Sequence, residues 1–453
     1  MARENVLRVI AASLAFAGIF CVSGITVYAG NVFGTRAVGG VAVDANGVVK
    51  QITVSERNEF LKRLRQDVER AAGELNLPVE LRKVSLRGLE AALQDSVNNQ
   101  QGRLPEAVKL LAGLQRIQFV LIYPEQNDIV LAGPGEGWKV DDQGNIVGLT
   151  TGQPVLQLED LLIAFRSVDA ARREGISVSI DPTAEGRRNF EQFMKRQSTF
   201  NPRVLNGIEQ AMGPQQVSYT GIPANTHFAR VLAAADYRMK RLAMDLDESP
   251  IPELPSFLDL LNQGRRTPNN AMPRWWLACN YEPLARSEDK LVWELRGPGV
   301  KALTEDEFIQ ADGTVRGTGQ QDPTAKRWAE NMTAKYQELA KTEPIFAELR
   351  NLMDMCIIAA LIQREDLGGL AGGVSLPLLT GKESGVAVEN WNPLKTLPTQ
   401  CSVLKIGRNY VVTASGGVQI DSWEVAAKNE VTPAVGKVHD KAAKPAGSAW
   451  WWN

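Results

Sequence analysis

The chain has 453 residues, of which 44% are hydrophobic and 23% are charged. This ordinary globular composition provides enough apolar material for a sizeable core, and the length suggests two or three domains. The net charge of -2 is too close to neutral to favour a nucleic-acid partner, and no apolar run beyond residue 29 is long enough to span a bilayer.

The first 29 residues have the three parts of a secretory signal peptide. Arg3 and Arg8 form a positively charged start, Val9–Val22 is an apolar stretch, and Val27–Ala29 places small or aliphatic residues where a signal peptidase cuts. We therefore predict an exported protein that is cleaved after Ala29 and acts in the periplasm, at the cell surface or outside the cell. The alternative is an uncleaved anchor that tethers the protein to a membrane.

Removal of the signal also removes Cys21 and leaves Cys279, Cys356 and Cys401. Three cysteines are too few for a disulfide framework. Cys356 lies in an apolar run, so we expect a buried thiol there. Cys279 and Cys401 lie in strand-like segments and would form a disulfide only if the fold brings them together, which spacing does not decide.

Three short hairpins, each followed by an amphipathic helix, are predicted along the chain. Turn residues such as Asn and Gly accept positive φ between alternating apolar residues, and the apolar residues that follow recur with helical spacing. The hairpins are Val41–Val49, Trp138–Val147 and Phe308–Val315, and the helices are Ser55–Leu75, Leu158–Arg172 and Asp322–Lys341. Duplication of one module and chance similarity between common α+β units are both left open.

Strands and helices also alternate between residues 116 and 245. The strands are Arg116–Tyr123, Asp128–Leu131, Ile176–Ile180 and Gln216–Gly221, and the helices lie near Gly186–Arg196, Pro202–Met212 and Thr226–Asp245. Asn225 or Thr226 is the expected N-cap of the last helix. Its basic residues fall largely outside its apolar face. We therefore expect a basic surface exposed to solvent, and the alternative is a surface that binds an acidic partner.

The stretch from Glu248 to Pro273 is rich in proline and is predicted to separate two domains. We predict an α+β fold with mixed or antiparallel sheets covered by helices, in which the domains span residues 30–249 and 274–427 around a linker at 250–273. The second domain is expected to contain strands at Trp275–Tyr281 and Lys290–Arg296, an apolar helix at Glu343–Glu365 and a hairpin at Ser402–Ala414. Residues 428–453 are predicted to form a disordered tail.

Histidine is nearly absent from the chain, which contains only His227 and His439. A His-rich zinc or copper centre is therefore excluded, and we predict no metal and no cofactor. A Ser-His-Asp triad would have to use His227. Asp236 lies about 13 Å further along the same helix, which is too far to orient the imidazole. We therefore expect His227 to be a polar residue of the first helical turn.

Glu125 and Asp128 are candidate catalytic residues, because both lie in a loop between two strands. Paired carboxylates at such a place are compatible with acid–base chemistry on a sugar, although the separation that decides this is not set by the sequence. No Gly-x-Ser-x-Gly elbow and no phosphate-binding loop is present.

Two groups of tryptophans are candidate binding residues. Trp275 and Trp276 are neighbours on a strand, so their side chains point to opposite faces. Burial on both faces is favoured over an exposed platform for a partner or a carbohydrate. Trp450, Trp451 and Trp452 end the chain, where an aromatic cluster would dock onto a sheet edge or a partner groove, or would have no role.

Four segments together carry a resemblance: Gly40–Gly47, Tyr123–Trp138, Ala235–Leu242 and Arg274–Leu277. They resemble an uncharacterised family of exported proteins from planctomycete bacteria. The resemblance spans about residues 38–425 and implies export and a shared fold. It implies no activity and no site residues, because the family is a domain of unknown function.

Two functions follow as hypotheses. The first is a non-enzymatic structural or binding protein of the cell envelope, whose partner is an envelope protein or a polysaccharide. The alternative is an exported hydrolase of polysaccharide or peptidoglycan that uses carboxylates such as Glu125 and Asp128.

Overall fold

The computed structural model describes residues 37–39, 41–44, 46–50, 54–99, 104–196, 203–265, 273–305, 307–309, 315–317, 321–381, 386, 388–406, 408–444 and 450–453. They belong to one unit that spans Arg36–Asn453. The predicted signal peptide and Cys21 lie outside the described residues. No helix in the described part of the chain is long and apolar enough to cross a membrane.

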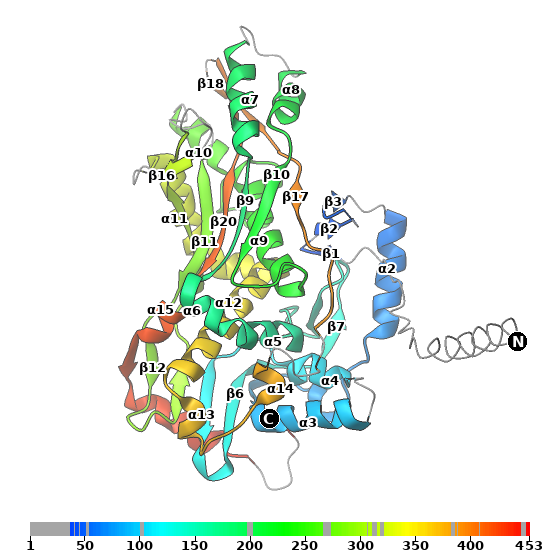
Figure 1. Ribbon diagram of the computed structural model, residues 1–453, viewed down its shortest axis with the longest axis vertical. Helices are drawn as coiled ribbons and strands as arrows, with labels where there is room; N and C mark the ends of the chain where they lie inside the picture. Colours follow the sequence, from blue (N-terminus) through cyan, green and yellow to red (C-terminus); the bar gives the residue numbers. More distant parts are fainter. Residues whose placement is uncertain are drawn as a thin grey trace, which may run out of the picture. The chain divides into compact units, whose positions relative to one another are not determined.

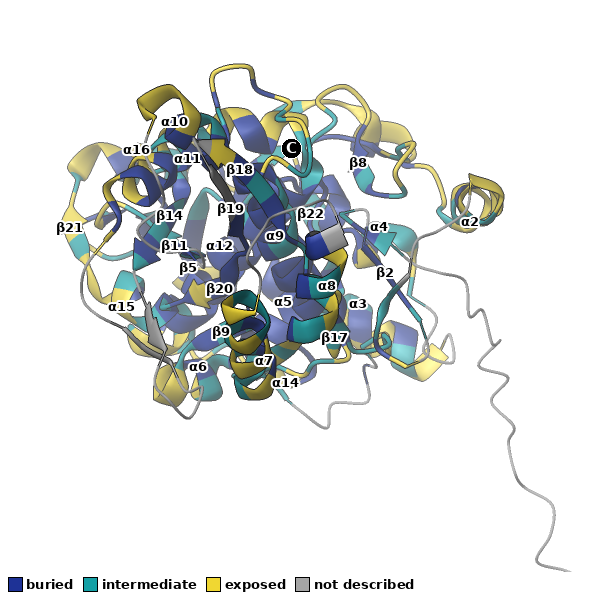
Figure 2. Ribbon diagram, turned by 90° about the horizontal axis from the view of Figure 1, so that it is seen from above, coloured by how far each residue is buried: buried dark blue, intermediate teal, exposed yellow. Residues whose placement is uncertain are grey.

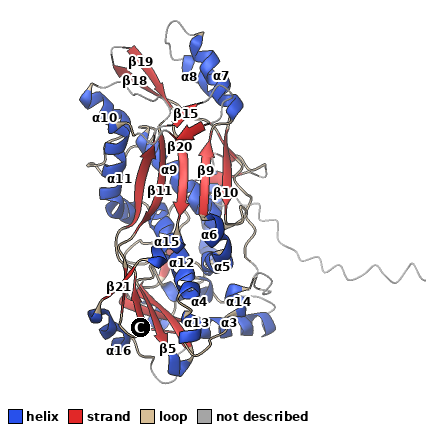
Figure 3. Cartoon of the chain, turned by 60° about the vertical axis from the view of Figure 1, so that its left-hand side comes forward, coloured by secondary structure: helices blue, strands red, loops and turns tan. Residues whose placement is uncertain are grey.

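Two large sheets organise the described residues, and Figure 3 shows both of them. The six-stranded sheet has the order β14 (Gly299–Glu305), β11 (Arg274–Asn280), β20 (Ser415–Ile420), β9 (Ile176–Asp181), β10 (Gln215–Thr220) and β17 (Thr396–Leu397). The seven-stranded sheet has the order β21 (Asn429–Val431), β12 (Leu284–Arg286), β13 (Val292–Glu294), β5 (Phe119–Tyr123), β6 (Asp128–Gly135), β4 (Val79–Ser85) and β22 (Trp451–Trp452). Neighbouring strands are antiparallel except for the parallel pairs β11–β20 and β12–β21.

The three predicted hairpins are confirmed as small antiparallel sheets. They are β2 (Val41–Val43) with β3 (Val49–Lys50), β7 (Trp138–Val140) with β8 (Ile146–Gly148), and β15 (Glu307–Ile309) with β16 (Val315–Gly317). Strand β1 (Ala37–Val38) pairs with β2, and β18 (Ser402–Ile406) pairs with β19 (Arg408–Val412).

The first two hairpin turns share the same chemistry. The carboxylate of Asp44 accepts hydrogen bonds from the backbone N–H groups of Asn46 and Val48 at 2.8 and 2.9 Å, and the carboxylate of Asp141 bonds its own turn in the same way. Gly47 and Gly144 have positive φ, as such turns require. These carboxylates therefore form the turns.

Helices surround the sheets and fill the space between them. The α-helices are α2 (Val54–Asp67), α3 (Leu86–Asn99), α4 (Glu106–Lys109), α5 (Leu158–Arg166), α6 (Val168–Glu174), α7 (Ala184–Lys195), α8 (Arg203–Met212), α9 (His227–Ala243), α10 (Phe257–Gly264), α11 (Pro323–Thr342), α12 (Pro344–Arg364), α13 (Leu367–Leu370), α14 (Pro377–Thr380), α15 (Ser422–Ala427) and α16 (Lys437–Lys441). The 3-10 helices are η1 (Gly73–Asn76), η2 (Leu111–Gly113), η3 (Pro124–Gln126) and η4 (Pro433–Gly436).

Helix α12 is the centre of the fold. Every residue from Ile345 to Leu361 except Arg350 is buried, and Figure 2 shows α5, α9 and α12 as the dark interior. Figures 1 and 3 place α12 between the two large sheets. Its buried Asp354 accepts hydrogen bonds from Arg116, which precedes β5, at 3.0 Å and from Tyr281, which follows β11, at 2.6 Å. The helix therefore joins the two sheets.

The fold class is α+β, as the sequence predicts, but a division into two domains is not confirmed. Both large sheets combine strands from before and after residues 250–273. The proline-rich stretch also buries Ile251 and Leu254, and Ser256 and Asp259 form a capping box at the start of α10. Within its described residues, 250–265, the stretch is therefore a packed connection, and the two large sheets are built from strands on both sides of it in the sequence.

The end of the chain is structured where the sequence predicts disorder. Residues 429–441 form β21, η4 and α16, and the terminal β22 pairs with β4 and forms the edge of the seven-stranded sheet. Val435, Ala442 and Trp452 pack in a cluster with side chains of β5, β12 and β13. The segment is polar on average, which is why its composition predicts disorder. It nevertheless contains a few apolar residues, and their burial stabilises the folded segment.

The described cysteines are all thiols. Cys356 is buried, as expected, and Cys279 and Cys401 do not pair with each other. Burial raises the pKa of the Cys279 and Cys401 thiols to about 12, so both stay protonated at neutral pH.

Candidate functional site

A cavity of about 440 Å³ lies where several elements meet. Its walls come from β1, α2, α4, the turn between β7 and β8, the first turns of α5 and α9, α12 and the segment that precedes β17. Many of its lining side chains are apolar, including Phe60, Leu64, Leu110, Leu158 and Leu162. This volume lies in the range of sites that hold small molecules.

His227 is one of the polar groups of the cavity. Helix α9 begins at His227 because Thr226 caps it, with the Thr226 hydroxyl accepting a hydrogen bond from the Ala229 N–H at 3.1 Å. The imidazole is only 5% exposed, and its Nδ1–H donates to the buried carboxylate of Asp160 in the first turn of α5, at 2.9 and 3.0 Å. The Nε2 atom lies 3.4 Å from the side-chain nitrogen of Gln157, which also lines the cavity.

Asp160 controls the protonation of His227. Burial by itself would lower the pKa of the imidazole, but the charge and hydrogen bond of Asp160 outweigh it and raise that pKa to about 9. At neutral pH the two side chains therefore form a buried ion pair.

Glu348 is the second titratable group inside the cavity. It lies on α12, is 9% exposed, and its Oε2 atom is buried with no hydrogen-bond partner among the described residues. Burial raises the pKa of Glu348 to about 7, and the nearby charge of His227 limits the rise. Glu348 therefore changes its charge close to neutral pH.

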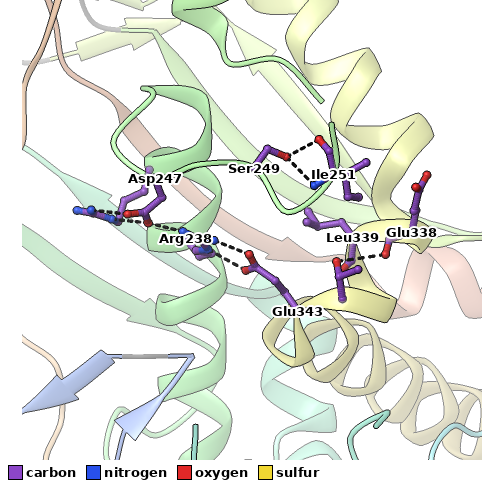
Figure 4. Close-up of polar contacts among 9 residues, drawn as sticks. Arg238, Asp247, Ser249, Ile251, Glu338, Leu339 and Glu343 are labelled. Carbon is purple, nitrogen blue, oxygen red and sulfur yellow. Dashed lines mark hydrogen bonds and ion pairs between the residues drawn. The ribbon is translucent and has the colours of Figure 1, made fainter. Parts of the chain in front are cut away.

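A network of ion pairs holds α9 against the start of α12, as Figure 4 shows. Arg238 of α9 binds the carboxylate of Glu343, the N-cap of α12, with a distance of 2.8 Å from Nε to Oε2. Arg238 also binds Asp247, which accepts two further bonds from Arg241 at 2.6 and 2.7 Å. Glu348 follows Glu343 by little more than one turn on the same helix.

The basic side chains of α9 are therefore not a solvated surface, contrary to the sequence-based expectation. Arg230 is 3% exposed and donates to the Asn392 carbonyl, and Lys240 is buried 2.6 Å from Asp236. Arg238 and Arg241 are engaged with Asp247. Helical periodicity separates the apolar face of α9 from its basic face, but it does not show that the fold buries Arg230 and Lys240 on the basic face.

The structure places the candidate residues Glu125 and Asp128 away from this cavity. Glu125 is exposed in η3. Asp128 is buried, accepting hydrogen bonds from the Ser85 hydroxyl at 2.5 Å and the Arg87 N–H at 3.1 Å, which fastens β6 to the start of α3. Burial raises the pKa of Asp128. Neither residue lines the cavity.

The paired tryptophans of β11 face opposite sides of the sheet. Trp275 is fully buried, with ring centroids 5.2 Å from Phe257 and 4.9 Å from Trp328. Trp276 is partly buried, and the Arg274 guanidinium lies 5.9 Å from its ring centroid.

The terminal tryptophans dock onto the edge of the seven-stranded sheet. The Trp450 carbonyl accepts a hydrogen bond from the Ser85 N–H at 2.8 Å, and Trp451 and Trp452 pair with β4. The Arg82 guanidinium lies 5.3 Å from the Trp451 ring centroid. Trp452 is 5% exposed, and its indole N–H donates to the Ala442 carbonyl at 3.2 Å.

Sequence reasoning misses the cavity because its polar residues are far apart in the chain. From the sequence, Asp236 on the same helix is considered as a carboxylate partner for His227 and is excluded, whereas the structure provides Asp160 from α5. Glu159 and Asp160 at the start of α5 indicate a carboxylate partner for His227 only when the packing of α5 against α9 is known. In the described part of the chain, no group of three or more His, Cys, Asp or Glu side chains is arranged to hold a metal ion.

Comparison with known protein families finds a match to part of the chain. A family model described as "Protein of unknown function (DUF1598)" matches residues 178–257, a span that includes the last four residues of β9, all of β10 and α9, and His227, but neither Asp160 nor Glu348. No match was found among curated proteins or solved structures. Of the segments behind the resemblance, Ala235–Leu242 lies inside the matched region, while export and bacterial origin stay predictions. The chain thus contains a DUF1598 domain, a domain of unknown function, at residues 178–257.

Proposed function

We propose that the protein is an exported, non-enzymatic binding protein of the cell envelope and that the cavity beside His227 and Glu348 is its ligand site. One observation carries the proposal: Glu348 has a buried oxygen at the cavity with no hydrogen-bond partner among the described residues. An unsatisfied buried polar group costs about 1–3 kcal/mol, which a ligand with a matching donor would offset. The proposed export rests on the signal-like features of residues 1–29 alone.

The low number of histidines provides a direct test. With histidine labelled at Cε1 with ¹³C, the protein gives signals from only His227 and His439, and a His439→Gln variant assigns them. We expect members of a fragment library of cationic, neutral and anionic compounds to shift the His227 signal and leave the His439 signal in place. A library in which no compound moves the His227 signal at millimolar concentration would exclude the cavity as a ligand site.

A second candidate function is acid–base catalysis in the same cavity. The specific observation is that His227, oriented by Asp160, and Glu348, with its pKa near 7, line one space. Groups whose environments shift their pKa values in this way are common in active sites. Hydrolysis of envelope polysaccharide or peptidoglycan that is lost in Glu348→Gln and His227→Gln, but kept in Glu125→Gln, would favour the enzyme over the binding protein.

A further inference from the structure

We propose that the ligand of this cavity is a primary amine with an apolar body, held as its ammonium ion against the Glu348 carboxylate. The inference rests on the proposed function and adds the chemical class of the ligand.

Acidic side chains outnumber basic ones among the described residues that line the cavity. Asp67, Glu106, Glu159, Glu348 and Glu389 are acidic, and Lys109 and His227 are basic. Both basic groups already have acidic partners, because Lys109 lies 3.1 Å from Glu106 and His227 lies 2.9 Å from Asp160. The described lining therefore carries more acidic than basic side chains, which favours a cationic ligand over an anionic one.

Glu348 shows where the positive group of the ligand belongs. A buried carboxylate keeps its charge only when a cation or several donors stabilise it. A hydroxyl or an amide would supply a hydrogen bond to Oε2 but no charge, and an anion would be repelled. An ammonium group supplies both charge and donors, with three N–H bonds for Glu348 and its neighbours.

The remaining walls indicate the body of the ligand. Leu64, Leu110, Leu158 and Leu162, together with Phe60, provide apolar surface from α2, α5 and the residue that follows α4. A chain of several methylene groups or a ring, joined to the ammonium, would cover this surface and exclude water from the ion pair.

The proposal predicts a pH dependence with a definite sign. Ammonium binding requires the charged carboxylate of Glu348, whose pKa in the ligand-free protein is about 7. Below that pH the carboxylate must lose a proton before it binds the ammonium ion. The affinity for the ligand therefore falls as the pH drops, and binding releases protons. The charged groups that act on Glu348 or share the cavity with it are His227 of α9, Asp160 and Glu159 of α5, Asp141 of the hairpin turn, Asp67 of α2, Glu106 and Lys109 of α4, and Glu389. His227 keeps its positive charge up to about pH 9, so between pH 6 and 8 Glu348 is the group whose charge changes most.

The test uses three probes of equal length, n-hexylammonium, hexan-1-ol and hexanoate, with the full chain. Calorimetry measures affinity, and the His227 signal reports whether binding is at the cavity. We expect hexylammonium to shift this signal and to bind about tenfold more weakly at pH 6 than at pH 8. Glu348→Gln should weaken hexylammonium binding at least tenfold at pH 8, while the matched exposed change Glu185→Gln on α7 should not alter it.

The outcomes separate the two proposals. Equal or stronger binding of hexan-1-ol or hexanoate at the His227 signal would overturn the amine as ligand and keep the cavity as a binding site. Hexylammonium binding that is independent of pH between 6 and 8 would also overturn the role of Glu348, and this measurement needs only the wild-type protein. If neither these probes nor any fragment moves the His227 signal, the proposed function fails together with the inference.

Discussion

The Nδ1 atom of His227 lies 2.9 Å from the Oδ2 atom of Asp160, although 67 residues separate the two in the chain. Both side chains are buried, and each comes from the first turn of a different helix, α9 and α5. A protonated imidazole at a helix N-terminus is opposed by the helix dipole, so the charge of Asp160 is what makes this arrangement stable. The packing of α5 against α9 therefore depends on the charges of His227 and Asp160 beside the cavity.

Removing the carboxylate should reverse the shift in the pKa of His227. In Asp160→Asn the asparagine still accepts a hydrogen bond from Nδ1–H but carries no charge, so burial dominates and the pKa should fall from about 9 to below its ordinary value of 6.5. Titration of the His227 signal by NMR measures this directly. A pKa that stays near 9 in the variant would show that Asp160 is not its cause.

The same pair predicts how stability depends on pH. The pKa of His227 is raised in the folded state, so the contribution of the ion pair is fully present below pH 6.5 and is lost as the pH rises through about 9. It should amount to about 3 kcal/mol, since each unit of pKa difference corresponds to about 1.4 kcal/mol. Urea unfolding at pH 6 and pH 9.5, compared between wild type and Asp160→Asn, should show a fall in the wild type that is much smaller in the variant.

Glu348 should reduce the stability of the free protein. Its folded-state pKa of about 7 lies above the ordinary value of 4.5, so the folded state loses stability as the pH rises from 4.5 to 7 and does not regain it at higher pH. Glu348→Gln should therefore raise the free energy of unfolding by roughly 1–3 kcal/mol at pH 8 and change it little at pH 4.5. A variant that is less stable at pH 8 would indicate a structural role for Glu348.

The Arg238 network should determine how α9 and α12 pack together. Arg238→Met removes the positive charge that Glu343 and Asp247 share, so two partly buried carboxylates lose an ion-pair partner. The variant should lower the free energy of unfolding by about 2 kcal/mol. The His227 signal should shift as well, because the start of α12 is less firmly held. Arg63→Met on α2 removes only an exposed contact with Glu59 at 3.6 Å and serves as the control, with no expected loss of stability.

The terminal tryptophan should be part of the fold. Trp452→Ala removes a buried indole from the cluster around β5 and β13 and should lower the free energy of unfolding by about 3 kcal/mol, whereas Asn453→Ala, at an exposed position, should have no effect. Deletion of residues 450–453 should also expose the edge of β4 and increase self-association, measured by light scattering after size exclusion. Unchanged stability and size in the deletion would show that the docked strand contributes nothing.

Much of the local structure could be predicted from the sequence. The turns at Asp44 and Asp141, the hairpin of β5 and β6, the N-cap at Thr226 and the apolar helix α12 all follow from residues within a few positions of one another. Turn chemistry, capping and helical spacing are local interactions, so neighbouring residues are enough to specify them.

The tertiary structure alone decided how these pieces combine. The parallel pairing of β11 with β20, the docking of β22 onto β4 and the burial of Arg230 and Lys240 on α9 depend on segments that are far apart in the chain. The same holds for the cavity, where α5, α9 and α12 bring Asp160, His227 and Glu348 together. Pairing and burial depend on which surfaces meet after folding, so no pattern within one segment reveals the partner of His227 or the raised pKa of Glu348.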